Sequence, residues 1–141
     1  MNNLAPIKLV SGIIVKHNKV LLGLRKNTQD FNHYWSLPIG HVEKQETYLT
    51  AIKRELKEEL SIDVLSVSEF CLKTDPEKNI HHQVFNIQSW DGVINNSEPD
   101  LCEQLSWFEF NQLPQRLTPV SRDILKDFIS ISAKLSRRLN V

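Results

Sequence analysis

The sequence contains little cysteine, no long hydrophobic run and no excess of charge of one sign. Its two cysteines, Cys71 and Cys102, lie far apart and form no CxxC pair, which argues against a cysteine-based zinc site. A chain of 141 residues is long enough to bury a core without disulfides. We therefore expect two reduced, packed thiols, with a disulfide between them as the alternative.

No apolar run is longer than three residues, whereas a membrane-spanning helix needs about 20. The N-terminal segment also lacks the basic start and the apolar stretch of a signal peptide. These absences lead us to expect a cytoplasmic protein that has no membrane partner.

Lysine and arginine together number 17, as do aspartate and glutamate, so the formal net charge is zero. A protein that binds nucleic acid polymers would show a basic excess or a basic tract. We therefore expect no nucleic acid polymer as partner, although a small phosphorylated ligand needs only a local site. The sequence leaves both a monomer and a homodimer open.

The order of predicted elements is typical of a single mixed α and β domain covering residues 1–141. Runs of β-branched and apolar residues predict strands at 9–15, 19–24, 64–72, 82–90 and 107–110. The first two strands would join at His17 and Asn18, and Pro38 excludes a central strand around it. Periodicity predicts helices over 46–60 and 119–139.

Each predicted helix has an apolar stripe that should pack on the core. In segment 46–60 the stripe recurs at steps of three and four residues and consists of Leu49, Ile52, Leu56 and Leu60. In segment 119–139 the apolar residues that share one side are Ile124, Leu125, Phe128, Ile131 and Leu135.

Three glutamates, Glu55, Glu58 and Glu59, lie beside the first stripe on a helical wheel, whereas the neighbouring basic residues face solvent: Lys53, Arg54 and Lys57. Like charges three or four residues apart destabilise a helix by a few tenths of a kcal/mol per pair. A solvated charged face would explain this pattern, with Arg54 pairing with Glu58. A divalent cation would explain it equally well, because Mg²⁺ prefers carboxylate oxygens, waters and substrate phosphates.

These residues are part of a longer motif. Gly40 is followed after five residues by Glu46, and after seven more by the run RELKEELSI at 54–62. The spacing resembles the Nudix box over 40–62, with Ser61 in place of the family's glycine. The run WSLP at 35–38 and the pairs Glu98-Pro99, Trp107-Phe108 and Leu113-Pro114 resemble MutT-type members on either side of the box.

The resemblance implies a mixed sheet sandwiched between helices and hydrolysis of a nucleoside diphosphate derivative with Mg²⁺ or Mn²⁺. It implies metal ligands at Glu55, Glu58 and Glu59, with the Gly40 carbonyl as a further one. Glu46 and Arg54 would hold the loop and the helix together. Ser61 would have to avoid a left-handed conformation or adopt it at a cost of ~1 kcal/mol or more.

Members of the family differ in which residue accepts the proton from the attacking water. A glutamate of the box, Glu55 or Glu58, is one choice. A glutamate in the turn-rich segment 95–104 is the other, and there we favour Glu103 over Glu98. An ordinary surface carboxylate remains the alternative for both.

Substrate binding is weakly encoded. Arg25 is suited to binding a phosphate with two hydrogen bonds, but a solvated arginine at a strand end looks the same. Trp35, beside Tyr34, would stack on a base or pack in the core, and His41 would touch a phosphate. His81 and His82 are interpreted as surface or cross-strand residues instead of a metal site.

The leading hypothesis is therefore a Mg²⁺-dependent hydrolase that cleaves a pyrophosphate linkage in a nucleoside triphosphate or related nucleotide. Nucleotide sugars and dinucleoside polyphosphates are alternative substrates. A module that binds a nucleotide without cleaving it, and a purely structural interaction protein, are the alternatives from other classes.

Overall fold

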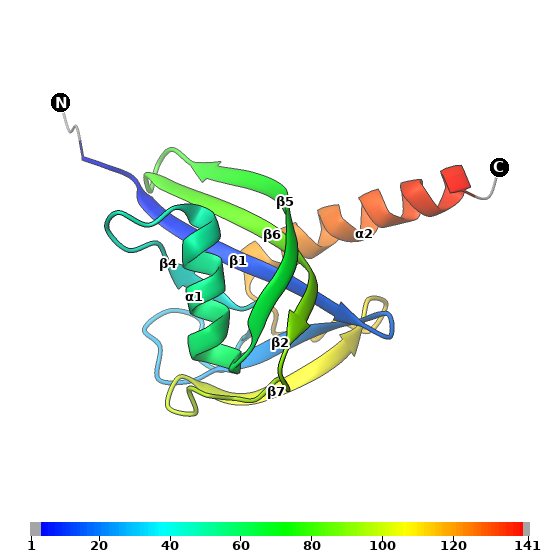
Figure 1. Cartoon of the computed structure of the whole chain (residues 1–141), viewed down its shortest axis with the longest axis horizontal. Coiled ribbons are helices and arrows are strands. Elements are labelled where there is room, and N and C mark those ends of the chain that lie inside the picture. Colours follow the sequence, from blue (N-terminus) through cyan, green and yellow to red (C-terminus); the bar gives the residue numbers. More distant parts are fainter. Residues whose placement is uncertain (1–3, 140–141) are drawn as a thin grey trace.

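A mixed sheet of seven strands forms the centre of the structure, a computed structural model that describes residues 4–139 (Figure 1). The strands are β1 (Ile7–Lys16), β2 (Lys19–Arg25), β3 (Trp35–Ser36), β4 (Ile39–His41), β5 (Asp63–Asp75), β6 (Ile80–Asp91) and β7 (Cys102–Glu109). Their order is β3-β2-β1-β6-β5, with β4 also paired to β1 and β7 to β2. β1 and β6 run parallel, and the other pairs are antiparallel.

Strand β1 pairs with β6 along one edge and divides the pairing of its other edge between two strands. Its first half pairs with β4, whereas its end pairs with β2 across the tight turn at His17 and Asn18. Both turn residues have positive φ, 53° and 61°, as a two-residue hairpin requires. Pro38 separates β3 from β4, so these short strands pair with different partners.

The two helices, α1 (Tyr48–Leu60) and α2 (Pro119–Leu139), cover opposite faces of the sheet (Figure 1). Successive residues of a strand point to opposite faces. Accordingly, Val10 and Ile14 of β1 pack in the cluster that includes Leu56 of α1. Ile13 packs in the second cluster, with Leu125 of α2. The predicted arrangement of a mixed sheet between helices is confirmed.

Helix α1 begins two residues later than predicted. Gln45 has a φ of 72°, and Thr47 caps the helix by accepting a hydrogen bond from the Thr50 N–H. Glu46 is therefore free to use its side chain in the preceding loop. The predicted stripe was wrong at Leu49, which is 42% exposed, while Ala51 is fully buried.

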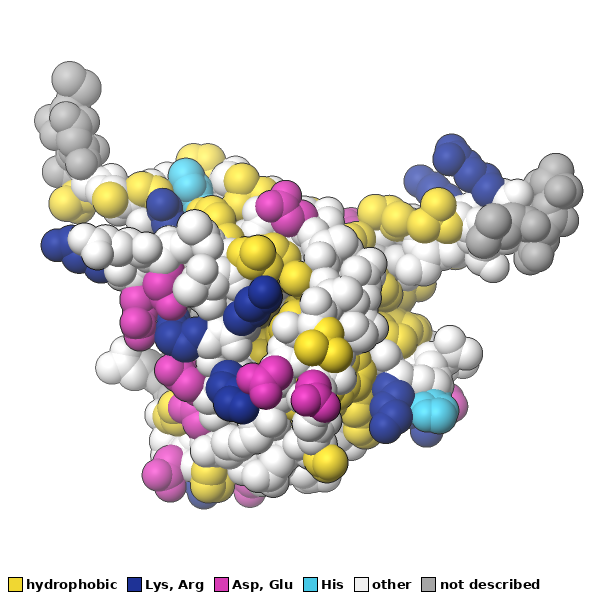
Figure 2. All heavy atoms as spheres, viewed as in Figure 1, with side chains coloured by type: hydrophobic (Ala, Val, Ile, Leu, Met, Phe, Trp, Pro, Cys, Tyr) yellow, Lys and Arg dark blue, Asp and Glu magenta, His cyan; other side chains and the backbone are white. Residues whose placement is uncertain are grey.

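Helix α2 has the predicted bounds, but only its first half packs on the sheet. Ile124 and Leu125 are buried, whereas Ile131 and Leu135 are 46% and 54% exposed, so the predicted stripe was too long. The second half extends away from the sheet, and hydrophobic and basic side chains lie exposed along it (Figures 1 and 2). Among the described residues, no helix is both long and apolar enough to span a bilayer.

Strand β7 begins at Cys102, earlier than the predicted 107. Glu103 and Gln104 are thus strand residues and do not belong to a turn-rich loop. The strand is long because it pairs with β2 along most of its length, from Lys19↔Glu109 to Arg25↔Cys102. Cys71 and Cys102 are free thiols, as predicted.

His82 was predicted as a surface or cross-strand residue; it lies across from Lys73 but is buried, with 3% exposure. Its Nε2 is 2.6 Å from the Ser11 Oγ. Burial, with a smaller effect of Lys73, lowers the pKa of His82 to about 4.

Stability should therefore fall in acid through His82. The unfolded chain takes up a proton near pH 6.5, whereas the folded protein resists it until about pH 4. The free energy of unfolding should decrease over this window by at most about 3 kcal/mol on account of this group. His82→Gln, which can still bond to Ser11, should make the decline shallower in urea unfolding at stepped pH. His81→Gln is the control, and an unchanged slope in His82→Gln would contradict the assignment.

Candidate active site

Arg54 of α1 joins the helix to the loop that precedes it. Its Nε donates to one carboxylate oxygen of Glu46 at 2.7 Å, and its Nη2 donates to the other at 2.9 Å. The same Nη2 donates to the His41 carbonyl at 2.9 Å. These hydrogen bonds lower the pKa of Glu46 and raise that of Arg54. The prediction that Arg54 faces solvent was wrong, because its side chain is only 22% exposed.

Arg54 also contacts two glutamates of its own helix. Its Nη1 lies 3.0 Å from Glu55 Oε1 and 3.2 Å from Glu58 Oε2, the latter being the pairing predicted from spacing. The Glu55 side chain is 14% exposed, and that of Glu58 is 52% exposed. One guanidinium therefore orients the carboxylates on this side of the helix.

Gly40 of β4 lies directly against the Glu55 carboxylate. A Cβ atom built on Gly40 would overlap all three atoms of that carboxylate group. Only a residue without a side chain leaves room for Glu55 here. Gly40 thereby sets how closely the strand and the glutamate approach each other.

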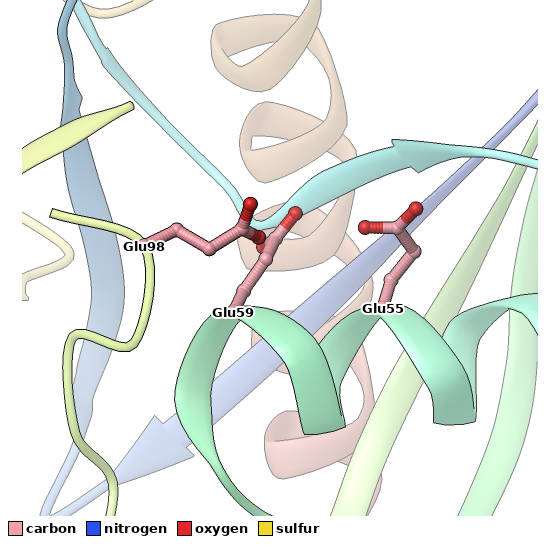
Figure 3. Close-up of side chains that lie close together, drawn as sticks. All are labelled: Glu55, Glu59 and Glu98. Atoms are coloured by element: carbon pink, nitrogen blue, oxygen red, sulfur yellow. The ribbon is translucent and has the colours of Figure 1, made fainter. Parts of the chain in front are cut away.

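Three carboxylates, those of Glu55, Glu59 and Glu98, meet beside α1 (Figure 3). Each offers one oxygen, and these oxygens lie within 4.8 Å of one another. Glu55 and Glu59 are one helical turn apart, and Glu98 comes from the loop between β6 and β7. Figure 3 shows Glu59 and Glu98 pointing toward each other. We call these three residues the acidic triad.

The triad is electrostatically unfavourable by itself. Burial raises the pKa of Glu59 well above its ordinary value, and the neighbouring carboxylates of Glu55 and Glu98 raise it further. Burial also raises the pKa of Glu55, against the opposing effect of the Arg54 hydrogen bond. A positive ion among the oxygens would remove this repulsion.

The triad borders a mostly apolar cavity of about 410 Å³. Glu59, Glu98 and Gly40 lie in its wall, while β2 and the loop after β6 contribute apolar side chains such as Leu24 and Leu101. A second cavity of about 690 Å³ lies near the start of α2. The two cavities share three lining residues: Arg25, Ser36 and Ile39.

The comparison with protein families agrees with this geometry. A model described as NUDIX domain matches residues 7–128. The chain belongs to the Nudix family of pyrophosphohydrolases.

Three relatives illustrate the likeness. An ADP-ribose pyrophosphatase of Methanocaldococcus jannaschii is 34% identical over 89% of this chain and 75% of its own length. An 8-oxo-dGTP diphosphatase of Buchnera aphidicola is 32% identical over 72% of this chain and 82% of its own. The crystal structure of a MutT NUDIX hydrolase from Burkholderia pseudomallei has a TM-score of 0.79, with 30% identity over 86% of this chain and 96% of its own.

The structure brings together most, but not all, of the residues predicted for the Nudix site. Glu55, Glu59 and Gly40 meet as expected, whereas Glu58 is outside the triad and bonds to Arg54. Glu98, the less favoured of the two late glutamates, completes the triad.

Glu103 instead lies 3.7 Å from His33 and is half exposed. Glu103 has this position because it belongs to β7, which begins five residues before the predicted strand. The pair Glu98-Pro99, already part of the MutT-type likeness, was the sequence signal for the residue that joins the triad.

The predicted substrate residues divide into two groups. Arg25 lines both cavities, and His41 lines the smaller one. Trp35 packs edge-to-face on Phe108 at 4.8 Å within the second core cluster, as the packing interpretation expected. Arg25 Nε and Thr118 Oγ1 are buried without a hydrogen-bond partner among the described residues, and no sequence pattern pointed to Thr118.

Gly40→Ala should reduce turnover at least about tenfold, since the new methyl group displaces the Glu55 carboxylate from Arg54. Gly12→Ala is a matched control on the adjacent strand. Its Cβ would meet only apolar side chains, at 3.2 Å from Ile87 and 3.4 Å from Leu56. This control should cost stability and leave kcat unchanged. Full activity in a folded Gly40→Ala variant would contradict the close approach.

Proposed function

We propose that this Nudix enzyme uses Mg²⁺ or Mn²⁺ to hydrolyse a pyrophosphate linkage in a nucleoside triphosphate or a related nucleoside diphosphate derivative. The observation that carries the proposal is the acidic triad, which gathers three carboxylates from two distant segments at the wall of a cavity. Repelling carboxylates in this position are explained by a cation, and a cation beside a cavity suits a phosphate ligand.

The residues present fit a hard divalent ion. The triad offers only oxygen ligands, which Mg²⁺ and Mn²⁺ prefer. We propose Glu55, Glu59 and Glu98 as ligands, with the neighbouring Gly40 carbonyl as a further one. Glu58, predicted as a ligand from the box, is assigned instead to the group that Arg54 orients.

A bound divalent ion supplies charge neutralisation for the phosphates and makes an attacking water more acidic. The protein supplies the arrangement. Arg54 holds Glu55 in place, Glu46 holds Arg54, and Gly40 fixes the distance between strand and helix. A carboxylate of this site then accepts the proton of the water.

We propose that this proton acceptor is among the carboxylates beside the cavity. Glu98 reaches the triad from a separate loop, and Glu55 and Glu58 lie on the helix within reach of Arg54. Glu103, which contacts His33 outside the triad, is not part of this proposal.

Arg25 is the proposed phosphate-binding residue. Its Nη2 donates to the Asp30 carbonyl at 3.1 Å, while its buried Nε has no partner among the described residues. Because Arg25 lines both cavities, a ligand that extends from one to the other would pass it. A nucleotide is long enough to do so, with its base and its phosphates at different ends.

An RNA pyrophosphohydrolase of Orientia tsutsugamushi is 26% identical over 92% of this chain, so RNA is one alternative substrate. Other relatives support a small nucleotide and leave its identity open. Their names give ADP-ribose, 8-oxo-dGTP and, for an Escherichia coli relative that is 29% identical over 90% of this chain, CTP. Nucleotide sugars and dinucleoside polyphosphates are therefore further alternative substrates. We propose that the enzyme acts in the cytoplasm, as monomer or homodimer, on free nucleotides.

A substrate panel tests the proposed activity. The protein is incubated with Mg²⁺ or Mn²⁺ and with canonical and oxidised nucleoside triphosphates, ADP-ribose and other nucleotide sugars, and dinucleoside polyphosphates. Release of phosphate or pyrophosphate, or of a nucleoside monophosphate, should depend strictly on the cation. Absence of turnover across the panel would contradict the proposal and favour a module that only binds.

Glu59→Gln separates the catalytic role of the triad from its effect on stability. At neutral pH the metal-free variant should melt on the order of 2–5 °C higher, because a partly buried carboxylate that its neighbours repel is gone. Added Mn²⁺ should no longer raise its melting temperature, and turnover should fall at least about 100-fold. Scanning calorimetry with and without Mn²⁺, alongside initial rates, measures all three effects.

Glu109→Gln is the matched control, since Glu109 is an exposed glutamate of β7 away from the triad. It should retain both turnover and the Mn²⁺ effect. Wild-type turnover in Glu59→Gln would refute the assignment of the triad as the metal site.

A further inference from the structure

The end of helix α1 differs from the Nudix box in one residue, and the structure shows what that residue does. Ser61 occupies the position of the box glycine and adopts the left-handed conformation, with φ 60° and ψ 34°. Glycine reaches this conformation without strain, and serine does not. The Ser61 N–H still caps the helix by donating to the Lys57 carbonyl at 3.0 Å. The helix therefore ends in a left-handed C-cap in spite of the side chain.

The Ser61 side chain forms a hydrogen bond that glycine could not make. Its hydroxyl bonds to the hydroxyl of Ser97, in the loop between β6 and β7. The same loop is tied to the last turn of α1 by its backbone. The N–H of Asn95 donates to the Leu60 carbonyl, and that of Ser97 to the Glu59 carbonyl, each at 3.0 Å. These are the carbonyls that a helix end leaves without a partner.

The residue that follows Ser97 is Glu98, the loop's contribution to the acidic triad. The side chain of Glu98 faces that of Glu59 (Figure 3). Both are carboxylates, so they repel each other before a cation binds. Backbone hydrogen bonds already restrain the loop beside Glu98: the Ser97 N–H donates to the Glu59 carbonyl, and the Glu98 N–H donates to Asn96 Oδ1. The Ser61–Ser97 hydrogen bond adds a side-chain restraint to these. Among the described residues, the Ser61–Ser97 hydrogen bond is the only side-chain link between Ser97 and the C-cap of α1.

We propose that the Ser61–Ser97 hydrogen bond holds Glu98 against Glu55 and Glu59, which makes both serines positioning residues of this enzyme. The inference rests on the proposed function, because it assumes that the triad binds a divalent ion. In this chain, the strain of a left-handed serine is offset by a link that preorganises the third carboxylate.

The test measures Mn²⁺ affinity directly, by titration with the electron paramagnetic resonance signal of free Mn²⁺. Ser61→Ala, Ser61→Gly and Ser97→Ala should each raise the Kd for Mn²⁺ about tenfold, the lower end of what losing an outer-shell partner costs. Ser97→Thr, which keeps a hydroxyl, should retain the affinity. The double variant of Ser61→Ala and Ser97→Ala should bind no more weakly than either single variant.

Ser61→Gly distinguishes positioning from general stabilisation. It removes the hydroxyl but also relieves the backbone strain, so its melting temperature should equal or exceed that of the wild type while Mn²⁺ binding weakens. Ser66→Ala is the matched control, because Ser66 forms a similar exposed hydroxyl pair with Ser89 at 2.6 Å between β5 and β6. It should leave the Kd unchanged.

The outcomes separate two failures. If Glu59→Gln loses Mn²⁺ binding but the variants of Ser61 and Ser97 bind as the wild type does, the positioning role is overturned and the metal site stands. If Glu59→Gln and the wild type bind Mn²⁺ equally, or neither binds, the proposed function fails and this inference fails with it.

Discussion

The site depends on the hydrogen bonds of one guanidinium. Arg54 donates two hydrogen bonds to Glu46 and one to the His41 carbonyl. It also orients Glu55 and Glu58. A lysine offers one point charge and could not make these contacts in one fixed plane. Arg54 and Glu46 are largely shielded from water, and their hydrogen bonds tie the loop after β4 to α1. The spacing of the Nudix box thus has a direct physical reason.

Around this fixed point the protein places charges that oppose its own stability. Glu59 lies partly buried and close to Glu55 and Glu98, and the resulting rise in its pKa shows that the charged form is disfavoured there. Above that pKa the metal-free fold is less stable than it would be with a neutral side chain. Such a conflict between local stability and arrangement is typical of a functional site. A cation reverses it, because the same three carboxylates then become ligands.

Much of the fold follows from the sequence, because periodicity depends on neighbours in the chain. The hairpin at His17 and Asn18 and the bounds of α2 were predicted in this way. The exposure of Ile131 was not, since it depends on how far the sheet extends beneath α2. Which of Glu98 and Glu103 lies beside Glu59 could not be predicted for a similar reason. The answer depends on where β7 begins and on the backbone hydrogen bonds that join the loop to α1. Only the folded chain defines these.

A crystal structure of the Mn²⁺-soaked protein with a non-hydrolysable nucleotide analogue, using anomalous scattering to locate the metal, tests the central claim most directly. The account predicts an anomalous peak within bonding distance of carboxylate oxygens of Glu55, Glu59 and Glu98, with the phosphates beside it. Manganese bound elsewhere, with these three side chains turned into solvent, would contradict the account.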